Sequence, residues 1–257
     1  MLRLHEKENS LDWPSDLCGF AIRAIKDFLM SEDDHQDNNL DFYAAEVVKK
    51  CLLPNDEKGA RYLVDALVAH ASHRYGSFYK AEQTAAALAE RSPLIFLDNA
   101  LASKDSKLRF SRYATHHHPP LAKIDPQILV EWCQRGDLER WVLVAEAIRP
   151  FCSHDNRLDD GAKAVSLSRQ ADYLLQTAPC PGSILEKLAF HITPTSWSGS
   201  RAAIMERRFA ALEILSNHSR REVREAFAIC AKKIRLNIAR EHERELSEDH
   251  ERDVSFE

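Results

Sequence analysis

The clearest indication of the fold is the sequence DPQILVEWCQRGDLERWVLVAEAI, residues 125–148. Asp125 stands directly before Pro126, which places a capping side chain ahead of a proline suited to the first position of a helix. Gly136 and Asp137 then combine the stop of one helix with the cap of the next, so almost no loop separates the two apolar runs. Helices joined this closely must be antiparallel neighbours. The stretch therefore predicts a helical hairpin.

Apolar residues recur at intervals of three and four along most of the chain, as on the buried face of a helix. Alternating strand patterns are missing and β-branched residues are scattered, so we expect an all-α fold of about ten helices. On the first helix, Leu17 and Phe20 belong to the predicted apolar face. The segments with helical spacing are Leu17–Leu29, Phe42–Leu52, Leu63–Ala71, Phe78–Leu88, Ile128–Cys133, Trp141–Ile148, Val165–Leu175, Ile184–Ile192, Ala203–Leu215 and Val223–Ile238.

Amphipathic helix pairs joined by short turns stack most naturally as an α-α superhelix, or solenoid, in which each pair covers its neighbour's apolar face. A compact bundle is the alternative. We expect one helical-repeat domain over residues 1–257, with a weak joint near 116–123 as a variant of that prediction. Residues 240–257 are almost entirely charged, which predicts a solvated C-terminal helix extension or tail.

Composition excludes several classes of function. The seven glycines among 257 residues never stand close enough for a P-loop or a dinucleotide fingerprint. The net charge of −5 has the wrong sign for general attraction to nucleic acid. The six cysteines include no zinc-binding pair, and we interpret most of them as small buried residues in a reducing compartment. Residues 1–10 are charged and no apolar run could span a membrane, so we expect a cytoplasmic protein without membrane partners.

Motifs that contain histidine raise two chemical possibilities, a metal site and an RNase active site. His116, His117 and His118 precede two prolines in a stretch that cannot be helical, where adjacent side chains point to different sides, so we expect no metal site there. We expect no catalytic residue and no cofactor. One enzymatic alternative remains, an RNase of the HEPN type, a helical family whose active site holds an arginine and a histidine four to six residues apart. Arg112 and His117 are the best such pair.

Two resemblances bear on function. The helix from Arg207-Arg208-Phe209 to Leu215, its short turn and the following Val223-Arg224-Glu225-Ala226 resemble a HEAT repeat, whose second helix often opens with Val-Arg. Trp13-Pro14, Thr84–Arg91 and Met205–Arg208 are similar to the C-terminal helical-repeat region of large bacterial NTPase proteins of the antiphage-defence type. In that class the repeats sense a ligand and an upstream NTPase domain responds. This chain contains no Walker lysine and no NTPase domain, so the resemblance implies the sensor role alone.

These patterns favour macromolecular recognition without catalysis, as a protein-binding scaffold or sensor with a role in bacterial antiviral defence. A protein partner is the first expectation, and the oligomeric state is open. Trp197, in a loop of small polar residues, is better explained as a staple for the helix that follows it, and its alternative role is to anchor a partner. The other alternative is a nucleic-acid-binding repeat protein that uses a basic face. That predicted basic face comprises Arg201, Arg207, Arg208, Arg220, Arg221, Arg224, Lys232, Lys233 and Arg235.

Overall fold

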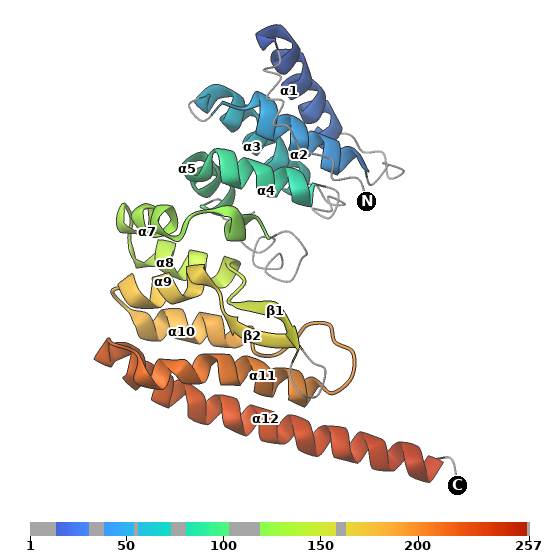
Figure 1. Cartoon of the computed structure of the whole chain (residues 1–257), viewed down its shortest axis with the longest axis vertical. Coiled ribbons are helices and arrows are strands. Elements are labelled where there is room, and N and C mark those ends of the chain that lie inside the picture. Colours follow the sequence, from blue (N-terminus) through green and yellow to red (C-terminus); the bar gives the residue numbers. More distant parts are fainter. Residues whose placement is uncertain are drawn as a thin grey trace, which may run out of the picture. The chain divides into compact units, whose positions relative to one another are not determined.

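A computed structural model describes residues 14–30, 39–53, 56–72, 81–102, 119–157 and 163–255 (Figure 1). The chain divides into two compact units, Met1–Ala100 and Leu101–Glu257. Helices make up most of the described residues, which confirms the predicted helical class. No described helix combines the length and the apolar character needed to cross a membrane.

The first unit is entirely helical where it is described. Two observations show that α2 and α4 run parallel: Asp41, near the start of α2, binds the first turn of α4, and Arg91, at the end of α4, donates to the carbonyl of Lys49 near the end of α2. α1 likewise packs against α3, so each helix contacts the next but one along the chain. The elements are α1 (Ser15–Met30), α2 (Asn39–Cys51), α3 (Glu57–Ser72), α4 (Glu82–Arg91), α5 (Pro93–Phe96) and the π-helical turn η2 (Leu97–Leu101).

The second unit repeats this alternate packing, since α7 contacts α9, α8 contacts α10 and α10 contacts α12 (Figure 1). The predicted caps of the first helix pair are confirmed. Asp125 Oδ1 accepts the amide of Gln127 at 2.8 Å, and Asp137 Oδ1 accepts that of Glu139 at 3.0 Å. The helices are η3 (Pro120–Lys123), α7 (Pro126–Gln134), α8 (Leu138–Ala147), α9 (Arg169–Thr177), α10 (Pro181–Phe190), α11 (Arg201–Glu213), η4 (Ile214–Asn217) and α12 (Arg221–Ser255).

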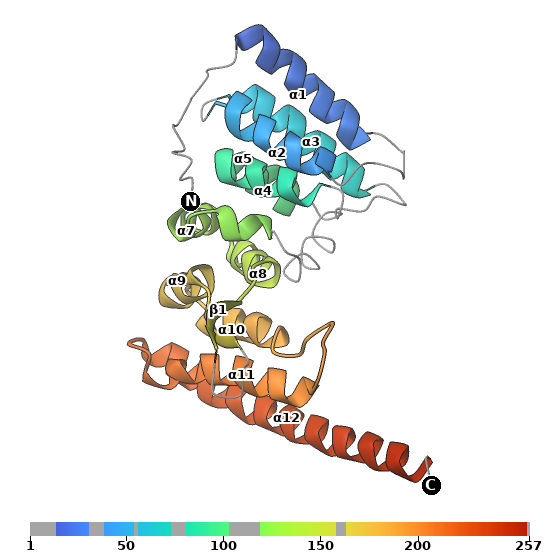
Figure 2. The ribbon, with the colours of Figure 1, turned by 45° about the vertical axis from the view of Figure 1, so that its right-hand side comes forward.

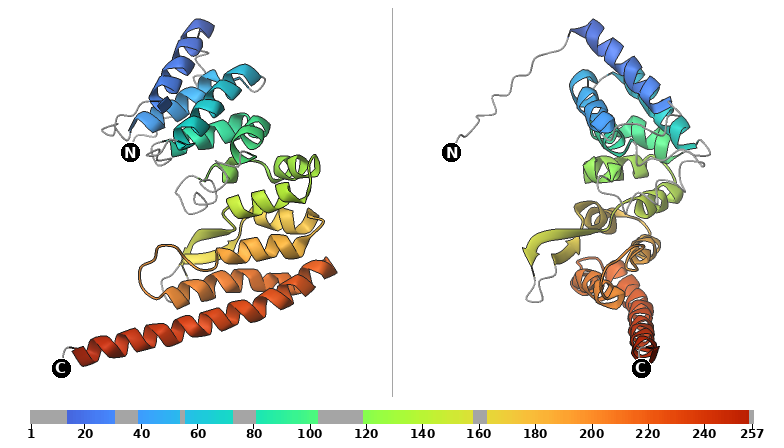
Figure 3. Two further views of the ribbon diagram at one scale, coloured as in Figure 1. Left: turned by 180° about the vertical axis from the view of Figure 1, so that it is seen from behind. Right: turned by 90° about the vertical axis from the view of Figure 1, so that its right-hand side faces the viewer.

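A β-hairpin interrupts the helices of the second unit, which the sequence did not predict. β1 (Phe151–Arg157) pairs antiparallel with β2 (Lys163–Leu167), and the pair extends away from the neighbouring helices (Figure 3, right). The helix predicted over Val165–Leu175 is therefore wrong in its first part. α9 begins only at Arg169, because the Ser168 hydroxyl caps it. β2 packs against α11, so the strand takes part in the helix packing of this unit.

α12 is the longest element, with 35 residues (Figure 2). It packs against α10 and α11 through one buried row of apolar side chains and continues through the predicted charged extension to Ser255. The buried row comprises Val223, Phe227, Ala231, Ile234 and Ile238. A helix of this length has room for a second face that none of the described elements of its own unit covers.

Candidate binding surfaces

Arg208, which belongs to the predicted basic face, makes its contacts within the second unit. Its guanidinium donates to the carbonyls of His191 at 2.7 Å and Ile192 at 3.3 Å, at the C-terminal end of α10. It also lies over the ring of Phe151 at the base of the hairpin, 6.0 Å from the ring centre. Burial lowers the pKa of Arg208 from its ordinary value. The side chain thus joins α11, α10 and β1.

Arg220 caps a helix from a distance. It donates to three carbonyl oxygens at the end of α9, those of Leu175 at 3.1 Å, Gln176 at 3.0 Å and Ala178 at 2.9 Å. The last carbonyls of a helix have no intrahelical partner and carry partial negative charge, which suits a guanidinium. Arg224 similarly donates to the carbonyl of His218 at 2.6 Å. Neither arginine projects freely toward an external anion.

Arg201 and Trp197 form one cluster with the far part of α12. The guanidinium of Arg201 lies over the Trp197 ring at 4.5 Å, and its Nη1 is 3.5 Å from Glu241. Trp197 keeps 46% of its surface exposed. The ring therefore supports Arg201 and still presents one side to solvent, and its predicted role as an anchor stays a prediction.

Glu245 completes this cluster at the first turn of α11. Its carboxylate accepts the amide of Arg201 at 2.6 Å, the amide of Ala202 at 3.1 Å and the hydroxyl of Ser200 at 2.7 Å. These hydrogen bonds, led by the one from Ser200, lower the pKa of Glu245. Ser200 itself caps α11 by accepting the amide of Ala203 at 3.0 Å. Two groups therefore secure this helix end.

The remaining basic residues divide into paired and unpaired. Arg221 pairs with Glu225 at 2.6 Å, and Arg235 pairs with Glu213 at 3.2 Å. Arg207 also interacts within the chain. Lys232 and Lys233 are exposed on α12 and have no ion pair with any residue that the structure describes. Most of the predicted basic face is thus committed to intrachain acceptors and does not form one bare positive surface.

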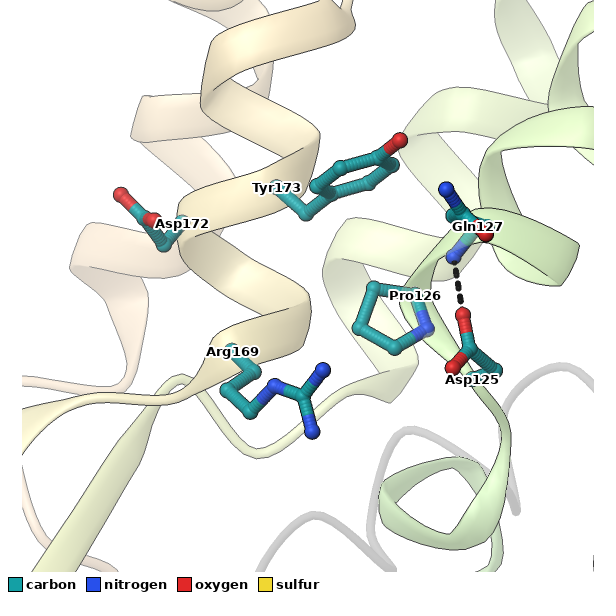
Figure 4. Close-up of a pocket in the computed structure, with 6 residues that line it drawn as sticks. All are labelled: Asp125, Pro126, Gln127, Arg169, Asp172 and Tyr173. Carbon is teal, nitrogen blue, oxygen red and sulfur yellow. Dashed lines mark hydrogen bonds between the residues drawn. The ribbon is translucent and has the colours of Figure 1, made fainter.

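An open hollow of about 340 Å³ lies between the start of α7 and the start of α9 (Figure 4). Both of its carboxylates are already engaged along their own helices, Asp125 by the amide of Gln127 at 2.8 Å and Asp172 by the Gln176 side chain at 2.7 Å. These hydrogen bonds hold both carboxylates against their own helices. The lining residues are Asp125, Pro126, Gln127, Arg169, Asp172 and Tyr173.

Nucleophilic and metal chemistry find little support in the described residues. Burial raises the pKa of Cys133 to about 12, and burial together with the neighbouring Cys18 thiol raises that of Cys51 to about 12. Both thiols are therefore protonated at neutral pH, whereas the reactive nucleophile is the deprotonated thiolate. No metal-binding group of histidine, cysteine and acidic side chains occurs in the part of the chain that the structure describes. His116–His118 and the Arg112/His117 pair lie outside that part.

α1 carries a surface that sequence reasoning missed. Ile25 and Leu29 are buried, but Leu17 and Phe20, which were predicted to share their apolar face, lie in solvent together with Met30. Phe20 is 63% exposed. The apolar residues of α1 spread over a wide part of the helix circumference, and spacing alone does not indicate which part meets α2 and α3. We call the exposed side chains of Leu17, Phe20 and Met30, together with Arg23 and Asp27, which are exposed between them, the α1 outer face.

Comparison with known proteins provides no assignment: no family model, no curated protein and no solved structure matches the chain.

Proposed function

We propose that this chain is a non-catalytic protein-recognition module that binds a protein partner through the α1 outer face. One observation carries the proposal: Leu17, Phe20 and Met30 are large apolar side chains left in solvent on a helix whose opposite side is buried. Large apolar side chains that are exposed together on a structured surface often mark a protein-binding site. Large aromatic side chains such as that of Phe20 often dominate the energy of such interfaces.

We further propose that the helices form a HEAT-like solenoid. The alternate packing within each unit, α1 on α3 and α2 on α4, then α7 on α9 and α8 on α10, supports this arrangement. The resemblance to antiphage-defence repeat regions motivates the narrower proposal that this partner belongs to a defence system.

The test is affinity capture from the source cells with matched variants. We expect wild-type protein to retain a stoichiometric protein partner, whereas Phe20→Glu reduces its recovery at least tenfold, because a buried charge at an interface core is costly. Phe190→Glu is the control, since Phe190 is 81% exposed on α10 and lies in the other unit. It should leave capture unchanged. Circular dichroism of each variant checks that the fold is retained.

Nuclease treatment separates the alternatives. A partner that survives nuclease and depends on Phe20 supports protein recognition. Recovery of only nuclease-sensitive material, at equal yield from both variants, would overturn the proposal in favour of nucleic-acid binding. Shortened RNA in the captured material would direct attention to Arg112 and His117.

A further inference from the structure

α12 has a second face that the described part of its own unit leaves exposed. On the inner face, the apolar row from Val223 to Ile238 is buried, and the next two residues of that row, Glu241 and Glu245, contact the start of α11 and Arg201. The inner face is therefore occupied as far as Glu245. Other side chains of the same helix point away from it.

The opposite side of α12 carries residues at alternating intervals of three and four. We call this row the α12 seam: Ile229, Lys232, Leu236, Ala239, Glu243, Leu246 and His250. All seven are exposed, with Ile229 at 65%, Leu236 at 53% and Leu246 at 70%. None of its charged members has an ion pair with a described residue.

Alternation of three and four is the heptad spacing of a coiled coil, in which residues of one helix insert between residues of a facing helix. The seam from Ile229 to His250 extends over about 32 Å at 1.5 Å per residue. Isolated exposed apolar residues on a helix need no explanation, but a heptad row of this length fits a second helix.

We infer that the α12 seam is a homodimer interface, in which α12 of one copy pairs antiparallel with α12 of a second copy. In an antiparallel pair of identical helices, the residue numbers of two facing positions always add up to the same value. Placing Leu236 of one copy opposite Ala239 of the other fixes this sum and the whole register. Ile229 then faces Leu246, and Lys232 faces Glu243. The two-fold axis repeats each of these contacts, as a self-complementary interface requires.

Charge complementarity selects this register over its neighbours. A shift by one heptad in one direction brings Glu225 opposite Glu243. A shift in the other leaves Lys232 and Glu243 without an opposite charge, because they then face His250 and Ala239. A parallel, in-register pair would place Lys232 on Lys232 and Glu243 on Glu243. Like charges facing each other across an interface are disfavoured by several kcal/mol. Among these arrangements, only the antiparallel register with Leu236 opposite Ala239 gives every charge in the central layers an opposite charge.

The seam also indicates that the dimer is of moderate strength. The pairs of facing apolar residues are separated by the two Lys232–Glu243 pairs. A charged pair inside a coiled coil specifies the register at a cost in stability. Lys233 and Arg240 flank the seam on one side, where both copies contribute positive charge. We therefore expect a dimer that dissociates on dilution.

Charge reversal tests the register. Sedimentation equilibrium of the full chain should show a reversible monomer–dimer equilibrium. Lys232→Glu and Glu243→Lys should each weaken homodimerisation about 100-fold, because each creates two like-charge layers. An equimolar mixture of the two variants should dimerise again, since both charged layers become attractive in the mixed dimer. Asn237→Glu, an exposed position beside the inner face, is the control and should dimerise as wild type does.

Disulfide trapping tests the orientation. A mixture of Ile229→Cys and Leu246→Cys should crosslink under mild oxidation, while Ile229→Cys alone should crosslink no more than wild type. A wild-type chain that stays monomeric at every attainable concentration would overturn the inference, and so would a dimer that tolerates both charge reversals. Neither result would affect the proposal for the α1 outer face. Its variant, Phe20→Glu, lies in the other unit, and its effect is measured by affinity capture.

Discussion

Each unit contains an acidic side chain that caps a helix from another helix, and the two caps differ in burial. In the first unit, Asp41 of α2 accepts the amides of Gln83 at 2.8 Å and Thr84 at 3.0 Å and the Thr84 hydroxyl at 2.7 Å. In the second, Glu245 of α12 accepts two amides and the Ser200 hydroxyl of α11. Asp41 is buried, while Glu245 is only half-buried.

The helices that receive these caps also differ. The residue that precedes α4 is Ala81, which has no side-chain oxygen, so Asp41 takes the place of a local cap. α11 has its own cap in Ser200. A distant carboxylate is thus essential for capping where the local sequence provides no acceptor, as in α4. Where a local acceptor exists, as in α11, the distant carboxylate adds a second cap. Three substitutions test this difference, in order of decreasing effect.

Asp41→Ala should destabilise the first unit by about 3 kcal/mol, since it leaves buried amide and hydroxyl groups at the start of α4 without their acceptor. Urea unfolding followed by circular dichroism measures the loss. Asp41→Asn retains one oxygen acceptor and should cost less. Glu46→Ala is the matched control, because Glu46 lies on the same helix and makes a surface ion pair with Lys49. A loss from Asp41→Ala no larger than that of the control would contradict the essential role of this cap.

Glu245→Gln should cost about 1 kcal/mol at neutral pH, because the carboxylate is replaced by a weaker, neutral acceptor. Its pKa in the folded state lies below the ordinary value of 4.5, so the stabilisation is fully present above that value. It is lost as the pH falls through the folded-state pKa. Unfolding curves of wild type and variant should therefore converge once the pH falls below the folded-state pKa of Glu245. A gap that stays constant through this range would show that the charge of Glu245 contributes nothing.

Ser200→Ala should have the smallest effect, about 0.5 kcal/mol, because Glu245 still holds two amides of α11. The double variant with Glu245→Ala removes both acceptors and should cost more than the sum of the single changes. A strictly additive double-mutant cycle, measured by urea unfolding, would mean that the two caps act independently.

Local patterns predicted the helical class well. Asp125 and Asp137 stand two residues from the amides that they accept, so the sequence alone identifies them as caps. Asp41 and Glu245 act over more than 40 residues, and nothing near either one indicates which helix it meets. The β-hairpin was not predicted for the same reason, because its two strands stabilise each other only by pairing.

The candidate surfaces follow the same rule. A cluster of arginines in sequence predicts a basic face, but Arg208 and Arg220 bind carbonyl oxygens at the ends of α10 and α9, which only the packed structure brings near. The exposure of Phe20 could not be predicted either, because the apolar residues of α1 spread over a wide part of its circumference. The seam on α12 is visible in the sequence as a heptad, although its apolar members are fewer than those of a regular coiled coil.

The two buried thiols offer a way to follow each unit separately in one sample. Cys51 lies in the first unit and Cys133 in the second, and both are protected in the folded chain. A thiol reagent can modify either one only after its surroundings open. Peptide mass analysis at increasing urea would thus measure the opening free energy of each unit from its own cysteine. The chain carries a pair of built-in reporters of local unfolding.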